Sequence, residues 1–150
     1  MPETTIDTPT GPMVLTQVDD AITRAEWGSG RQDDTPLLRE AARQVAEYFE
    51  GTRQEFDLPL RVEASTFQQA VCDAMSAIPF GDTMTYGDIA KALGVPAQAV
   101  GQACGGNPIP VIIPCHRVLG ASGLGGFSGL GGVETKVWLL RHEGAAGLLI

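Results

Sequence analysis

The pattern of strand-forming and helix-forming segments changes at about residue 64, and the charge balance changes at the same place. Residues 1–64 hold 13 acidic and 6 basic side chains, whereas residues 65–150 hold 5 and 4. The acidic excess behind the formal net charge of −8 therefore lies almost wholly in the first half. We predict two domains, an N-terminal scaffold over 1–64 and a second domain over 65–150, in an α+β protein.

The first half has the pattern of a small α/β domain, a short antiparallel sheet with one helix. The segment "PMVLTQVDDAITRAEWG" predicts two strands around a turn at Asp19 and Asp20. The segment "TPLLREAARQVAEYFEG" predicts a helix that begins after Thr35 and ends at Gly51, because Pro36 suits the first helical position. Its expected buried stripe consists of Leu37, Leu38, Ala41, Ala42, Val45, Ala46 and Phe49.

The second half is predicted to be mainly helical. Ser65 or Thr66 can cap a helix over "FQQAVCDAMSAI", and two further helices, over about 85–93 and 97–104, flank a break at "GVP". Two short helices joined by a tight turn favour a helix-turn-helix of the winged-helix-like type, although such pairs also occur as plain packing units. The second helix of this pair carries several small residues, which let a neighbouring helix or a nucleic-acid groove approach closely: Ala97, Ala99, Gly101, Ala103 and Gly105.

A cysteine stands directly behind the apolar run "IPVII". The run predicts a buried strand that ends at Pro114 and presents the thiol of Cys115 in a surface pocket. A thiol reacts as its thiolate, and a neighbouring base such as His116 makes that form accessible, with Glu143 available to hold the imidazole. Adjacent side chains on an extended segment point to opposite faces, so a link between the two requires a local turn. From these residues alone, Cys115 is either a packing residue or a nucleophile.

Several classes of protein are disfavoured by composition. Cys72, Cys104 and Cys115 form no C-x-x-C pair, and two histidines do not provide the usual zinc-ligand spacing, so we expect no metal site. No apolar run reaches the roughly 18 to 20 residues that span a bilayer, and the segment "MPETTIDTPTGP" lacks a signal-peptide pattern. We expect a soluble, cytoplasmic protein that does not bind membranes. The net charge argues against a broad basic surface, but the nearly neutral second half permits contact with nucleic acid.

Six segments together resemble the O6-alkylguanine-DNA alkyltransferases in order and in near-correct spacing: "STFQQAV", "IPFGDTMTYGDIAKALG", "AVGQACGGNP", "PCHRV", "GGFSG" and "KVWLLRHEG". The resemblance covers residues 65–144 densely, and "TIDTPTGPMVLTQVDDAITRAEW" looks like the opening hairpin of the family. It implies a suicide DNA-repair protein that accepts an alkyl group from guanine O6, or less efficiently from thymine O4, once per molecule and without a cofactor. The implied partner is double-stranded DNA, bound by a monomer through the minor groove with the alkylated base flipped out.

The same resemblance implies catalytic roles for five residues. Cys115 would accept the alkyl group, and His116 would act as its base through a water molecule. Glu143 would orient the imidazole of His116. Asn107 would brace the active-site loop through backbone contacts, and Tyr86 would donate a hydrogen bond to the guanine ring as the leaving base gathers charge.

The remaining implied residues form the DNA surface and the base pocket. The DNA surface would comprise Thr85, Ala97, Gln98, Ala99 and Gly101. The pocket would comprise Val118 at its entrance, Phe127 and Ser128 in its lid, and Lys136 as a support of the closing loop. Gln98 stands where the family usually has arginine, after a turn about two residues shorter, and Phe127 stands where it commonly has tyrosine. Because glutamine carries no charge, the substitution together with the acidic first half predicts weaker and strongly salt-sensitive DNA association.

Three functions are compatible with these features. The first is a stoichiometric DNA alkyltransferase, and the second is a lesion-recognition protein of the same fold that binds without transferring. The third is a cysteine-dependent hydrolase or redox protein built on Cys115, His116 and Glu143. The number of products per protein molecule separates them, since a hydrolase gives many, a suicide transferase one and a sensor none.

Overall fold

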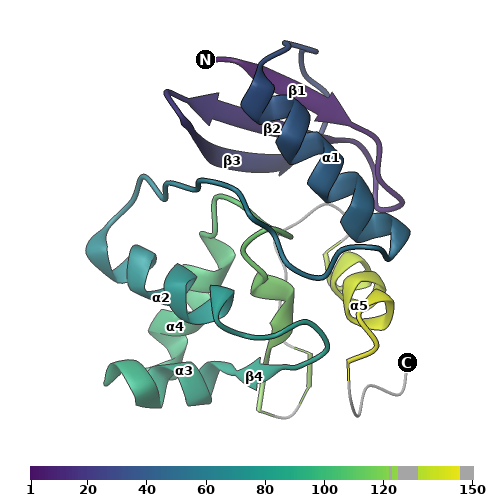
Figure 1. Ribbon diagram of the computed structural model, residues 1–150. Coiled ribbons are helices and arrows are strands. Elements are labelled where there is room, and N and C mark those ends of the chain that lie inside the picture. The colour runs from purple at the N-terminus through teal and green to yellow at the C-terminus, as the bar shows by residue number, and fades with distance from the viewer. Residues whose placement is uncertain (122, 125–131, 146–150) are drawn as a thin grey trace. The chain divides into compact units, whose positions relative to one another are not determined.

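The computed structural model describes residues 1–121, 123–124 and 132–145 (Figure 1). The chain divides into two compact units, Met1–Glu63 and Ala64–Ile150, and each is described by itself below. Among the described residues, no helix has the length and apolar character needed to cross a membrane.

The first unit contains a three-stranded antiparallel sheet in the order β1-β2-β3. Its strands are β1 (Glu3–Ile6), β2 (Met13–Val18) and β3 (Ala21–Trp27). The predicted hairpin between β2 and β3 is confirmed, with Asp19 in a left-handed conformation at the turn (φ 54°). The strand β1 extends the sheet beyond this hairpin by pairing with β2.

One helix, α1 (Pro36–Glu50), packs against this sheet (Figure 1). Its predicted ends are confirmed, since the hydroxyl of Thr35 accepts a hydrogen bond from the backbone of Leu38 and Gly51 is left-handed. The predicted stripe was partly wrong, because Ala46 is exposed and Leu37, Ala42 and Phe49 are only half-buried. The buried face instead comprises Leu38, Ala41, Gln44, Val45 and Tyr48. The helix is therefore rotated so that a glutamine and a tyrosine enter the core.

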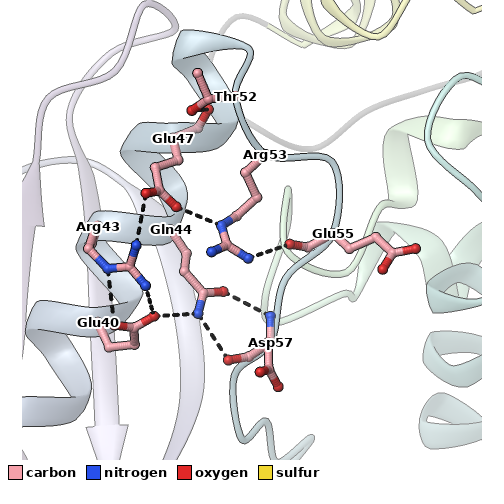
Figure 2. A network of polar contacts seen from close by, with 8 residues as sticks. All are labelled: Glu40, Arg43, Gln44, Glu47, Thr52, Arg53, Glu55 and Asp57. Carbon is pink, nitrogen blue, oxygen red and sulfur yellow. Dashed lines mark hydrogen bonds and ion pairs between the residues drawn. The ribbon is translucent and has the colours of Figure 1, made fainter.

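Figure 2 shows the polar network that ties α1 to the segment 52–57. Gln44 is 2% exposed, and its amide uses both ends. Its oxygen accepts from the backbone N–H of Asp57 at 2.8 Å, and its nitrogen donates to the backbone oxygen of Asp57 at 3.0 Å. The same nitrogen donates to Glu40 at 2.7 Å. Gln44 thus replaces the strand or helix partner that the backbone of Asp57 lacks.

Substituting Gln44 with alanine is expected to destabilise the first unit by about 1–3 kcal/mol, because two backbone groups of Asp57 lose their buried partner. Urea denaturation of the full chain measures this change. Arg43→Ala is the matched control on the same helix, because its ion pairs with Glu40 and Glu47 are solvent-exposed and such pairs contribute little to stability. Equal losses in the two variants would contradict the role given to Gln44.

The second unit begins with α2 (Thr66–Ser76), capped by Ser65 as predicted. A two-residue strand, β4 (Met84–Thr85), leads into α3 (Tyr86–Leu93), and α4 (Ala97–Gly105) follows after the left-handed Gly94. The two helices α3 and α4 pack against each other, in agreement with the predicted helix-turn-helix (Figure 1). Thr85 and Asp88 form a reciprocal capping box that fixes where α3 begins.

The segment before the cysteine does not form the predicted strand. Residues 109–113 contain a turn and one isolated bridge between Pro110 and Ile113, with Val111 in a left-handed conformation (φ 72°). Asn107 stabilises this loop, since its nitrogen donates to the oxygen of Ile113 at 2.8 Å. Its oxygen accepts from the backbone N–H of Ile109 at 3.0 Å. The apolar side chains are buried as expected, but in a compact loop.

After this loop the chain returns to regular structure. A single 3-10 turn, η1 (Cys115–Arg117), is followed by β5 (Val118–Leu119), which pairs in parallel with β4. The last described helix is α5 (Val133–His142), and Glu143 is its C-cap.

Candidate active site

Cys115 begins the η1 turn, directly after the loop that Asn107 holds. The prediction of a surface-pocket thiol was wrong, because Cys115 is only 7% exposed, with its backbone N–H bonded to Ile113 at 2.8 Å. Burial raises the pKa of this thiol to about 11, although a hydrogen bond with Asn107 and the charge of Lys136 act in the opposite direction. At neutral pH the thiol is therefore protonated, and a base must remove its proton before the sulfur can attack.

His116 and Glu143 form a buried pair. Nε2 of His116 lies 2.6 Å from Oε2 of Glu143, and both side chains are fully inaccessible to solvent. Burial lowers the pKa of His116, although its hydrogen bond to Glu143 opposes this change. The neutral imidazole donates from Nε2, because a carboxylate only accepts, and Nδ1 then carries the lone pair. Among the described residues this Nδ1 has no hydrogen-bond partner, so it is available as a base.

Arg117 completes the buried cluster. Its Nε donates to Oε1 of Glu143 at 2.8 Å, and its Nη2 donates to Oε2 at 3.0 Å. Its Nη1 donates to the backbone oxygen of Ile78 at 2.6 Å, and the guanidinium lies 5.8 Å from the ring centre of Phe80. A bidentate contact of this kind neutralises a carboxylate that would otherwise be costly to bury. The turn η1 thus places the cysteine, the base and the cation that anchors Glu143 in consecutive positions.

Lys136 is a second buried cation, at 0% exposure on α5. Its Nζ donates to the backbone oxygen of Val118 at 2.6 Å and lies 5.7 Å from the ring centre of Tyr86. Burial lowers the pKa of Lys136 to about 8, although the nearby thiols of Cys115 and Cys104 raise it. Lys136 therefore links β5 to Tyr86 and contributes positive potential at the thiol. Val118 itself is fully buried, and its predicted place at a pocket entrance remains a prediction.

The second unit also has a groove of about 550 Å³, and Tyr86, the aromatic neighbour of Lys136, is one of its lining residues. It is lined by Thr85, Tyr86, Gly87, Ala97, Gln98, Gly101, Gln102 and Ala121. The small residues of α4 do not all share one face, because successive members are two positions apart. Ala103 is buried, whereas Ala97 and Gly101 line the groove. Gln98 and Gln102, which lie four residues apart, also line the groove.

Some of the predicted features lie elsewhere or cannot be placed. Phe127 and Ser128 lie outside the described residues. Within the part of the chain that the structure describes, no group of His, Cys, Asp and Glu side chains could hold a metal ion. Cys72, Cys104 and Cys115 are all free and buried.

Comparison with known proteins assigns each unit to a described domain. Residues 66–145 match the model of the 6-O-methylguanine DNA methyltransferase, DNA binding domain, and residues 1–62 match that of the 6-O-methylguanine DNA methyltransferase, ribonuclease-like domain. The chain belongs to the 6-O-methylguanine DNA methyltransferase family. This confirms the resemblance that the motifs of the second half predicted.

Individual members of this family are similar over most of their length. A constitutive methylated-DNA–protein-cysteine methyltransferase of Bacillus subtilis is 41% identical over 93% of each chain. A methylated-DNA–protein-cysteine methyltransferase of Archaeoglobus fulgidus is 49% identical over 70% of this chain and 74% of its own. The crystal structure of Mycobacterium tuberculosis OGT in complex with DNA superposes with a TM-score of 0.85 at 41% identity, covering 95% of this chain and 92% of that one. The α+β fold class is thereby confirmed.

Two residues of the candidate site and its groove were not predicted from the sequence. Arg117 was read only as part of the "PCHRV" motif, although a basic residue next to a buried histidine could have suggested a partner for Glu143. Gln102 was overlooked among the small residues of its helix, although its spacing of four from Gln98 places both on one face.

Proposed function

We propose that this chain repairs DNA by moving an alkyl group from O6 of guanine onto Sγ of Cys115, once per molecule. The observation that carries the proposal is the buried hydrogen-bonded pair of His116 and Glu143, which leaves the imidazole Nδ1 available directly beside the cysteine in sequence. The proposal is supported by the family to which the chain belongs and by the methyltransferase names of its relatives. The five catalytic roles implied by the sequence resemblance are part of this proposal.

The proposed transfer is a displacement at a saturated carbon. The thiol proton of Cys115 passes to Nδ1 of His116 through a water molecule, and the sulfur attacks the alkyl carbon. The bond between that carbon and O6 breaks, and its electron pair stays on guanine. Tyr86 donates a hydrogen bond to the departing base, and the positive charge of Lys136 favours the thiolate. The thioether product has no hydrolytic escape, so each molecule acts once.

Because Cys115 is buried, the substrate base must leave the DNA double helix to reach it. A thiol with 7% exposure cannot reach a base that is stacked inside a duplex. We therefore propose that the alkylated nucleotide flips into the site while α4 binds the minor groove. Gln98 is exposed at the protein groove and would occupy the place of the flipped base. Thr85, Ala97, Ala99 and Gly101 would lie against the DNA. Val118, Phe127 and Ser128 remain proposed pocket residues. The acting species would be a monomer in the cytoplasm.

Intact-protein mass spectrometry tests this function. The full chain is mixed with an excess of duplex containing one O6-methylguanine, and peptide mapping locates any adduct. We expect one added methyl group per protein, on Cys115, with no further increase over time. Binding to the lesion without any adduct would instead support a lesion-recognition protein. Repeated release of a demethylated product from unmodified protein would indicate a hydrolase.

A further inference from the structure

The groove face of α4 presents two glutamines and no charged side chain. Gln98 and Gln102 lie four residues apart, so they stand on successive turns of one face, and both are exposed. Both line the groove together with Thr85 and Tyr86. Neither side chain makes a hydrogen bond to another described residue. The two amides are therefore available to a ligand that enters the groove.

An amide suits the edges of base pairs. Each glutamine offers two N–H donors and one oxygen acceptor. Every base pair presents acceptors in the minor groove, and a G·C pair adds the donor of the guanine amino group. One helical turn rises about 5.4 Å, and base pairs are stacked about 3.4 Å apart, so two glutamines one turn apart span between one and two base steps.

We propose that Gln102 is a second base-contacting residue, which reads the base pair next to the position that Gln98 occupies. This inference rests on the proposed function, and it adds a specificity-determining residue to the DNA surface. Two neutral amides then replace a single cation as the means by which α4 holds the duplex around a flipped nucleotide. The remaining groove positions on this helix, Ala97 and Gly101, are small enough to let both amides approach the bases.

A neutral contact has a distinct signature in binding. Removing one amide hydrogen-bond partner is expected to weaken duplex binding about threefold to tenfold. Because no counterion is released by a neutral group, the slope of log K against log salt concentration stays unchanged. Gln98→Arg, in contrast, adds a cation to the same face and is expected to tighten binding and steepen that slope by about 0.9.

The experiment measures fluorescence anisotropy of a labelled duplex carrying one O6-methylguanine, titrated with full chain at several salt concentrations. The variants are built on Cys115→Ala so that transfer does not deplete the lesion. Gln102→Ala is expected to weaken binding with an unchanged salt slope, and its effect should vary with the neighbouring base pair. Gln54→Ala, at an exposed position of the first unit, is the matched control and should bind as its parent does.

A second readout separates the groove from the thiol chemistry. Transfer from free O6-benzylguanine requires no duplex, so Gln102→Ala in the otherwise native protein should lose more of its transfer rate with the duplex than with this free base. If Gln102→Ala bound every duplex as tightly as its parent, the inference would be overturned while the proposed function stood. If the parent bound no duplex at all, the proposed function would fail as well. An equal loss of rate with the duplex and with the free base would overturn the inference by showing that Gln102 acts through the thiol site.

Discussion

Replacing Cys115 with alanine is expected to abolish methyl transfer while leaving affinity for alkylated duplex within about twofold of the native value, since the residue supplies the nucleophile and no DNA contact. Because the thiol is buried, its removal also costs packing, and we expect a loss of about 1 kcal/mol in the free energy of unfolding. Mass spectrometry measures the transfer, and urea denaturation measures the stability.

Two other buried thiols in the same unit provide matched controls. Cys72 is hydrogen-bonded by Gln68 on α2, and Cys104 lies near the end of α4. Burial raises the pKa of each of them, to about 12 for Cys104. Cys72→Ala and Cys104→Ala should lose similar stability but retain transfer at one methyl per protein. Loss of transfer in Cys104→Ala, with retention in Cys115→Ala, would move the acceptor to α4.

The boundaries of helices were predictable because their signals are local. Thr35, Pro36 and Gly51 bound α1, and Ser65 begins α2, through contacts within three or four residues. The loop before Cys115 was not predictable in the same way, because an apolar run of four or five residues fits a buried strand as well as it fits a buried loop. Asn107 stabilises the loop rather than a strand, because its side chain forms hydrogen bonds with backbone groups of Ile109 and Ile113 that a strand would have paired with a neighbouring strand.

The buried polar residues were the hardest to foresee. Gln44 enters the core because its partner is the backbone of Asp57, 13 residues away in the chain. Arg117 is buried because Glu143, 26 residues later, meets its guanidinium. The local sequence pattern does not indicate partners that lie so far along the chain. An isolated polar residue is also more often exposed than buried. The family resemblance indicated Glu143 as the partner of His116 but gave no role to Arg117.

Replacing Arg117 with methionine is expected to destabilise the protein by about 3–5 kcal/mol, because it leaves the carboxylate of Glu143 buried without its cation. The same change should alter how transfer depends on pH. Burial, together with the positive charge of Arg117 and Lys136, holds the pKa of His116 below its usual value, so the imidazole is neutral and basic at neutral pH. Without Arg117, one of the causes that lower the pKa of His116 is lost.

The sign of the pH effect follows from the base that transfer requires. With Arg117 removed, His116 binds a proton at higher pH than in the native protein, or Glu143 takes up that proton itself. Either event removes the neutral imidazole paired to a carboxylate, so transfer slows on the acid side and recovers as the pH rises. Single-turnover rates measured between about pH 6 and about pH 9 show this shift, because a neutral imidazole is needed throughout that range.

Two further substitutions distinguish positioning of Glu143 from a general loss of stability. Arg117→Lys keeps the charge but not the two-pronged contact, so it should restore much of the native pH dependence while remaining less stable. Arg141→Met removes an exposed charge from α5 and should change neither property. If Arg117→Met slowed transfer by the same factor at every pH, the guanidinium would matter for folding alone, since only a group that controls the ionisation of His116 and Glu143 makes the loss depend on pH.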